Sequence, residues 1–237
     1  MDKNEKLFEP LYQELHDSIN RYIKCLTTLV PVKGNRYDDE DIKLMVVGRA
    51  LNGWEENYAE DREEYFKQRT DELSKQDRFV KDKWIEKETG RPFWNYTKSI
   101  LEKLKKGELE TDWYQSILWS ELYPVSYSEG GNPSELLKYI QFDTAKKLLE
   151  TQIKVYEPTH VLIMTDWEGW FSLKEKNNPE KSNQFLPHIK PKTNSERNKF
   201  IKGSGFFEKS RVVVTCRPEF NNKEKFVEAV VEAFSSL

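Results

Sequence analysis

Cysteine and histidine are scarce in this chain of 237 residues. It contains two cysteines, Cys25 and Cys216, and three histidines. The cysteines form no CxxC pair, so the sequence offers neither a disulfide framework nor a four-cysteine zinc or iron–sulfur site. Three scattered histidines do not form a zinc motif or a catalytic triad either. We therefore expect no metal and no cofactor, and thiols that stay reduced.

Long apolar runs and a surplus of positive charge are also lacking. No stretch approaches the roughly 18 to 20 apolar residues that a membrane-spanning helix needs. The N-terminal residues are charged from the second position and lack the apolar core of a signal peptide, so we expect a cytoplasmic protein without membrane contact. The net charge of −3 provides no overall positive field of the kind that duplex-DNA binders use. A local basic patch stays open, because residues 174–211 contain ten Lys and Arg against four Glu.

Several catalytic motifs are missing as well. The sequence has no GxxxxGK[ST] loop, no GxGxxG fingerprint, no GxSxG elbow and no HExxH helix. These absences leave nucleoside-triphosphate, dinucleotide, serine-hydrolase and zinc-protease chemistries without support. The acidic run 55–64 is open to two interpretations, a divalent-cation site or the solvated face of a helix, and the second is favoured.

Short apolar runs alternate with amphipathic segments along the chain, which predicts an α/β fold. The runs expected to be strands are 42–48, 116–119, 161–164 and 212–215. Helices are expected at about 6–29, 91–106, 134–156 and 223–234, with a helical insertion at about 54–87. Helical crossovers make consecutive strands parallel and cover both faces of the sheet. We predict a single domain over residues 1–237, a three-layer α/β/α fold around a central, mainly parallel four-stranded sheet.

Ligands of such sheets bind beyond the carboxyl ends of the strands. The loops to consider therefore follow the four predicted strands. Their polar and aromatic residues are the candidates for ligand contact: Gly48, Arg49, Asn52, Trp54 and Glu55 after the first strand, Ser120, Glu121 and Tyr123 after the second, Asp166 and Trp167 after the third, and Arg217 after the fourth.

The order and spacing of these loops resemble the uracil-DNA glycosylase superfamily. The resemblance rests on Gly48-Arg49-Ala50-Leu51-Asn52-Gly53, on the proline-then-strand pattern at 156–161, and on Cys216-Arg217-Pro218. It covers the chain from about residue 42 onward. It implies that Asn52 takes the place of the water-positioning residue, that Ser120 stands where an Asn reads the base, and that Arg217 replaces the family's His.

Such a family implies hydrolysis of an N-glycosidic bond to a damaged or deaminated base. A cationic sugar must then be stabilised and trapped by water, and the departing base must receive hydrogen bonds. Asn52 or Glu55 would position the water, and Arg217 would face the departing base. Trp54, Tyr123 and Trp167 would stack against a flipped base. The expected partner is DNA or another nucleobase-containing ligand.

Structural roles for the same residues remain open. Asn52-Gly53 is a common turn pair, and Gly48 suits a tight strand-to-helix turn. Asp166 would also cap a helix over 167–171, and Arg217 would also serve in an ion pair. The alternative function is a catalytically inactive relative that binds a nucleic acid, a nucleotide or a protein, through a patch such as 174–211.

Overall fold

The computed structural model describes residues 5–19, 26–50, 92–127, 131–175, 178–192, 199–219 and 221–237. The predicted insertion at 54–87 lies outside these residues. So do the site candidates Asn52, Trp54 and Glu55.

The centre of the molecule is a set of four parallel strands. They are β3 (Leu44–Gly48), β4 (Ile117–Glu121), β6 (His160–Met164) and β11 (Ser210–Thr215). Their spatial order is β4-β3-β6-β11, and all three neighbouring pairs are parallel. Each strand coincides with an apolar run of the sequence, so the prediction of an α/β protein with parallel strands is confirmed for this centre.

The sheet is larger than predicted, because three antiparallel strands extend it to seven. β2 (Val32–Lys33) pairs with β4 at one edge, and β10 (Ile201–Phe207) and β9 (Lys190–Pro191) follow β11 at the other. The four-stranded prediction is therefore wrong in number. β10 escaped detection because glycine and polar residues interrupt its apolar positions, whereas the central strands are buried on both faces and form continuous apolar runs. A separate hairpin is formed by β7 (Ser172–Glu175) and β8 (Asn178–Gln184).

The N-terminal helix is shorter than predicted. α1 spans Glu5–Ile19, and Leu26–Thr28 forms strand β1, which pairs antiparallel with β5 (Val125–Tyr127). The predicted helix 6–29 is therefore wrong at its C-terminal end. The β-branched residues at 27, 28 and 30, followed by Pro31, favour extended backbone over helix.

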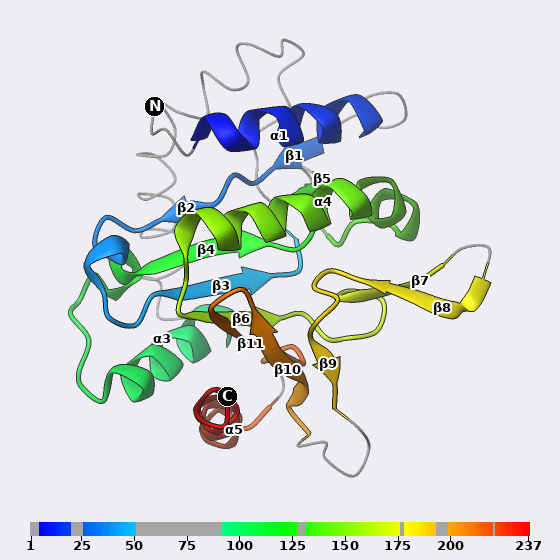
Figure 1. Cartoon of the computed structure of the whole chain (residues 1–237). Coiled ribbons are helices and arrows are strands. Elements are labelled where there is room, and N and C mark those ends of the chain that lie inside the picture. Colours follow the sequence, from blue (N-terminus) through cyan, green and yellow to red (C-terminus); the bar gives the residue numbers. More distant parts are fainter. Residues whose placement is uncertain are drawn as a thin grey trace.

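Helices cover both faces of the central strands (Figure 1). α4 (Glu135–Tyr156) lies on one face, and α1 packs against it. α3 (Pro92–Lys105) and α5 (Lys223–Ser235) lie on the other face. Side chains alternate accordingly: Val46 packs on the α3 and α5 side, and Val47 packs on the α4 side.

The N-terminal ends of α4 and α5 are capped by side chains. The Ser134 side chain accepts a hydrogen bond from Leu137 N, and the Asn222 side chain accepts one from Lys225 N. Two 3-10 turns, η1 (Tyr37–Asp39) and η3 (Trp113–Ser116), precede β3 and β4. No helix in the described ranges is both long and apolar enough to cross a membrane.

The strand order identifies one point on the carboxyl edge of the sheet. From β3 the chain crosses to β4 on one side, and from β6 it continues to β11 on the other. The order therefore reverses between β3 and β6. In open α/β sheets, loops diverge at such a switch point and ligands bind beside it. The residues that follow β3 and β6 are therefore the first place to look for a site.

Candidate functional site

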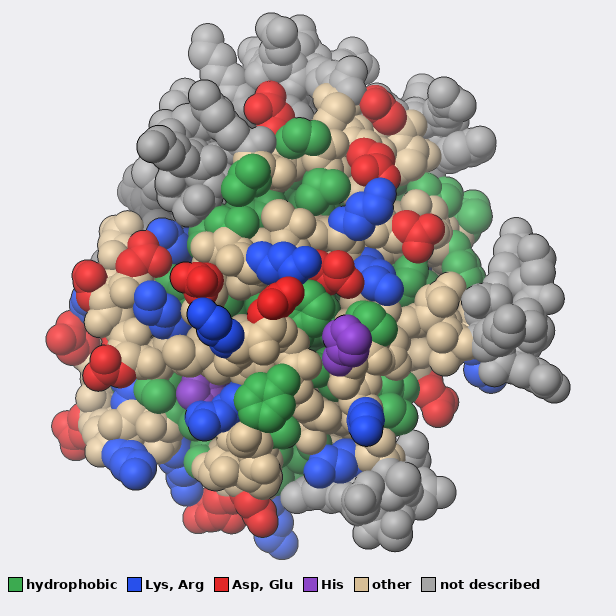
Figure 2. Space-filling view, viewed as in Figure 1, with side chains coloured by type: hydrophobic (Ala, Val, Ile, Leu, Met, Phe, Trp, Pro, Cys, Tyr) green, Lys and Arg blue, Asp and Glu red, His purple; other side chains and the backbone are tan. Residues whose placement is uncertain are grey.

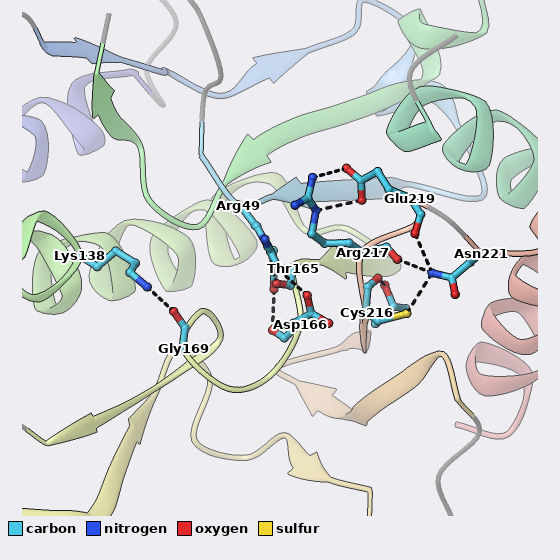
Figure 3. Close-up of polar contacts among 10 residues, drawn as sticks. Arg49, Lys138, Thr165, Asp166, Gly169, Cys216, Arg217, Glu219 and Asn221 are labelled. Carbon is cyan, nitrogen blue, oxygen red and sulfur yellow. Dashed lines mark hydrogen bonds and ion pairs between the residues drawn. The ribbon is translucent and has the colours of Figure 1, made fainter. Parts of the chain in front are cut away.

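An arginine and an aspartate face each other across the switch point. Arg49 follows β3 directly, and Asp166 stands two residues beyond β6. The Arg49 Nε atom donates to the Thr165 carbonyl at 2.7 Å, and its Nη2 atom forms an ion pair with Asp166 Oδ2 (Figure 3). The exposed fractions of the two side chains are 16% for Arg49 and 34% for Asp166. The pair is thus partly shielded from water, and the carboxylate is the more accessible partner.

Trp170 places an aromatic ring beside this pair. The Arg49 guanidinium lies 4.3 Å from the centre of the ring, and Lys138 Nζ lies 4.6 Å from it. Lys138 comes from α4, is almost fully buried, and donates to the Gly169 carbonyl at 2.7 Å. The Tyr123 hydroxyl donates to the Trp170 carbonyl at 3.0 Å. These contacts fix the loop after β6 against α4 and hold Arg49 against an indole.

Asp166 has a backbone conformation that is uncommon for a residue other than glycine. Its φ angle is 74°, in the left-handed region. Residues 167–171 form turns rather than a helix, so the interpretation of Asp166 as a helix cap is wrong. The Asp166 N–H donates to the Thr215 carbonyl of β11 at 2.9 Å, which helps to hold this conformation. Such strain concentrates at functional sites in proteins.

A second ion pair lies on the loop after β11. Arg217 Nε and Nη2 donate to the two carboxylate oxygens of Glu219, at 2.9 and 2.6 Å. Asn221 Nδ2 donates to the Arg217 carbonyl at 2.7 Å. Arg217 was expected either to face a departing base or to serve in an ion pair, and the structure contains the ion pair.

The two pairs form one group of four charges. Burial lowers the pKa of Arg49, and repulsion from Arg217 lowers it further, whereas Asp166 and Glu219 raise it. Since an arginine in a protein keeps its proton, both guanidiniums are cations held by carboxylates.

Glu121 lies on the other face of the same edge. It is paired in register with Gly48 of β3, and Trp119 Nε1 donates to its Oε1 atom at 3.2 Å. Its Oε2 atom is buried and has no hydrogen-bond partner among the described residues. A Cβ on Gly48 would lie 2.3 Å from this oxygen, so glycine is needed there to admit the carboxyl. Burial raises the pKa of Glu121 to about 8, and the group is mainly a neutral acid at pH 7.

The remaining candidates serve in packing. The Ser120 hydroxyl donates to Gln152 Oε1 of α4 at 2.7 Å and is buried. Tyr123 is buried beneath Trp170. The Trp167 ring packs on Phe171, with centroids 4.8 Å apart, and over Gly203 of β10, where a Cβ would lie 2.4 Å from the ring. Of the three stacking candidates, Tyr123 and Trp167 thus have their described ring contacts within the protein, and Trp54 lies outside the described residues.

The structure thus brings Gly48, Arg49, Glu121, Asp166 and Arg217 to one edge of the sheet. Sequence reasoning missed three residues that shape it: Lys138, Trp170 and Glu219. The sequence did contain a signal for Glu219, since a carboxylate two residues after an arginine is well placed to pair with it. Lys138 and Trp170 had none, because their importance depends on how α4 packs against the loop.

Two further observations concern metal-binding groups and surface charge. The described residues contain no group of three His, Cys, Asp or Glu side chains that could hold a metal ion. On the face turned toward the viewer in Figure 2, Lys and Arg side chains alternate with Asp and Glu. Ion pairs such as Lys147–Glu14 and Lys154–Glu208 link the two signs on the surface of the molecule. This face therefore presents a mixture of both charges and no broad field of one sign.

No protein-family model matches the sequence, and a search of curated proteins finds no match to it either.

Proposed function

We propose that the chain binds a nucleobase-containing ligand at the carboxyl edge of its parallel strands, as a divergent relative of the uracil-DNA glycosylase superfamily. The observation that carries the proposal is the Arg49–Asp166 pair, which spans the switch point between β3 and β6. An arginine offers planar donors and an aspartate offers acceptors, the groups that bind the polar edges of bases. Trp170 against Arg49 adds an apolar, aromatic wall.

The ion pairing of the arginines supports ligand binding better than it supports catalysis. Arg49 is paired with Asp166, and Arg217 is held by both oxygens of Glu219, so both cations are already balanced where a departing anionic base would need them. The Ser120 hydroxyl is engaged by α4. A site that orients a ligand through the first of these ion pairs does not require Arg217 or Ser120.

Glycosidic hydrolysis is the second candidate, and Asp166 is the observation in its favour. This carboxylate is partly exposed and lies in a strained backbone at the switch point. A carboxylate in such a place can stabilise a cationic sugar and orient a water molecule.

The first test measures equilibrium binding of six nucleoside 5′-monophosphates, those of uridine, cytidine, adenosine, guanosine, inosine and xanthosine. We expect Arg49→Ala to weaken binding of the best ligand by about tenfold or more, because a charged hydrogen bond contributes about 1.5 to 3 kcal/mol. Arg36→Ala is the matched control, since Arg36 pairs with Asp112 before β4, at the opposite edge of the sheet. Binding that survives Arg49→Ala, or that is absent from the wild type, contradicts the proposal.

The hydrolysis candidate is tested separately by strand cleavage. Oligonucleotides that carry uracil, hypoxanthine or xanthine are incubated with the protein and then treated with alkali. Cleavage that disappears in Asp166→Asn and persists in Arg36→Ala supports hydrolysis. No cleavage by folded protein in excess rejects it on these bases and leaves the binding proposal standing.

A further inference from the structure

The Glu121 carboxyl is placed beside the residues of the proposed site by two backbone hydrogen bonds. Leu122 N donates to the Gly48 carbonyl at 2.9 Å, and Tyr123 N donates to the Arg49 carbonyl at 3.0 Å. The carboxyl itself lies over Gly48, the residue immediately before Arg49. Arg49 and Glu121 therefore occupy neighbouring positions on adjacent strands, with their side chains on opposite faces of the sheet edge.

Only one of the two carboxyl oxygens has a partner among the described residues. The Trp119 indole donates to Oε1, which suits an acceptor oxygen. Oε2 is buried and has no hydrogen bond within the described part of the chain. A buried polar atom without a partner costs free energy, commonly the full desolvation of that atom. Such an atom at the edge where ligands of α/β sheets bind indicates a hydrogen bond that the ligand completes.

The surroundings of Glu121 decide which kind of hydrogen bond this is. Among the described residues, Glu121 contacts the Trp119 ring and the Gly48 backbone, and no described basic side chain contributes to its titration. A carboxyl group without a counter-ion in an apolar place keeps its proton. With Oε1 occupied as an acceptor, the proton belongs on Oε2.

We propose that Glu121 is a hydrogen-bond donor to the ligand, with Oε2 carrying the proton. The ligand group that it recognises is an acceptor without a hydrogen of its own, such as a carbonyl oxygen or an unprotonated ring nitrogen of a nucleobase. This inference rests on the proposed function. It also assigns a specificity to the site. Arg49 offers hydrogen-bond donors from one side of the edge, and Glu121 offers a donor from the other side. Bases rich in hydrogen-bond acceptors are therefore preferred.

The test compares Glu121→Gln and Glu121→Ala with the wild type, using the best-binding of the six nucleoside monophosphates. Gln keeps an N–H donor at this position, so we expect binding within about threefold of the wild type at pH 7, whereas Ala leaves the ligand acceptor unpaired and weakens binding about tenfold or more. Glu40→Gln is the control, because Glu40 precedes β3 and pairs with Lys105 at the opposite edge.

A pH series separates a donor from a merely structural residue. Above pH 8 the wild-type affinity should fall toward tenfold per pH unit, because the group that loses its proton has a pKa of about 8. The Glu121→Gln variant cannot lose that proton, so it reports the titration of the ligand itself. Cys216 and Tyr96 at the same edge have pKa values raised above their usual values by burial, which moves their titration away from this range.

Each outcome decides the matter. A wild-type affinity that falls more steeply with pH than the affinity of Glu121→Gln supports the donor role. An affinity that is independent of pH, that rises with pH, or that Gln and Ala reduce equally overturns it; the proposed function then survives if Arg49→Ala still abolishes binding. If no monophosphate binds the wild type at any pH, the proposed function fails and the donor role fails with it.

Discussion

The side-chain carboxyl groups at the carboxyl edge of the sheet are of two kinds, ion-paired and neutral. Asp166 and Glu219 pair with arginines, whereas the Glu121 Oε2 atom is buried and no described cation contributes to the titration of this carboxyl. Two kinds of carboxyl group therefore lie within one edge of the sheet. Environments that separate the protonation states of neighbouring groups are typical of sites that bind or transform polar ligands.

Glu121 also makes the stability of the fold depend on pH. Its pKa in the folded chain is about 8, raised from 4.5, so the unfolded chain loses this proton first. The contribution of protonated Glu121 to the free energy of unfolding is complete below pH 4.5. It is lost as pH rises toward 8, by about 1.4 kcal/mol per pH unit between these values. We expect the free energy of unfolding of Glu121→Gln, measured with urea, to increase relative to that of the wild type from pH 5 to pH 7.

In the same measurement, Glu40→Gln should show no such change between pH 5 and pH 7, and it should show the opposite trend only at lower pH. The pKa of Glu40 is lowered: burial raises it, but its hydrogen bonds to Lys105 and Ser116 and the charges of Lys105 and Arg36 outweigh that effect. Its contribution is therefore present at neutral pH and is lost as pH falls below the usual value for glutamate. A difference between Glu121→Gln and the wild type that stays constant from pH 5 to pH 7 would show that Glu121 is not buried as a neutral acid.

The sequence predicted part of this residue chemistry. It placed Arg49, Asp166 and Arg217 on loops that meet, because parallel strands bring their carboxyl ends to one edge. It did not predict that Arg217 is balanced by Glu219, nor that Ser120 turns toward Gln152. Those outcomes depend on which face of the strand each side chain takes, and a shift of one residue in register would reverse them.

Among the elements, the loop after β6 depends most on a contact that is distant in sequence. Lys138 of α4 is buried, donates to the Gly169 carbonyl and lies over Trp170. We expect Lys138→Met to loosen residues 166–171, because Met fills a similar volume but supplies neither the hydrogen bond nor the cation–π contact. Hydrogen exchange should accelerate at the Phe171 and Ser172 amides, which bond within this loop.

The control for this variant lies on the exposed side of the same helix. Lys147→Met removes an exposed pair with Glu14, which contributes little to stability. Its exchange at Phe171 and Ser172 should match the wild type. Unchanged exchange in Lys138→Met would mean that the loop is held by its own turns and not by α4.

Elements buried on both faces were the ones that the sequence predicted well. Strands β3, β4, β6 and β11 coincide with apolar runs, and α4 and α5 lie within one residue of the helices predicted at about 134–156 and 223–234. The elements at the margins were harder. β9 has two residues, one of them proline, and β1 was assigned to the preceding helix, because three-residue strands carry too short a pattern and pair only through tertiary contacts.

At the scale of the whole molecule, the fold gathers charged side chains at one edge of the sheet. The strand order reverses between β3 and β6, and the charged groups that follow these strands and β11 meet there. The chain as a whole has a small net charge of −3 and mixes both signs on the face shown in Figure 2. Under the proposed function, we expect a ligand to be selected by the local arrangement of donors, acceptors and one indole rather than by long-range attraction.

The most direct test of this account locates the ligand on the molecule. Amide resonances of the uniformly labelled protein are followed by NMR while the best-binding nucleoside monophosphate is added. The account predicts shifts at Gly48, Arg49 and residues 165–170, at the carboxyl edge, and none at Arg36 or His160, at the amino edge. Shifts confined to the amino edge, or no shift at saturating nucleotide, would contradict it.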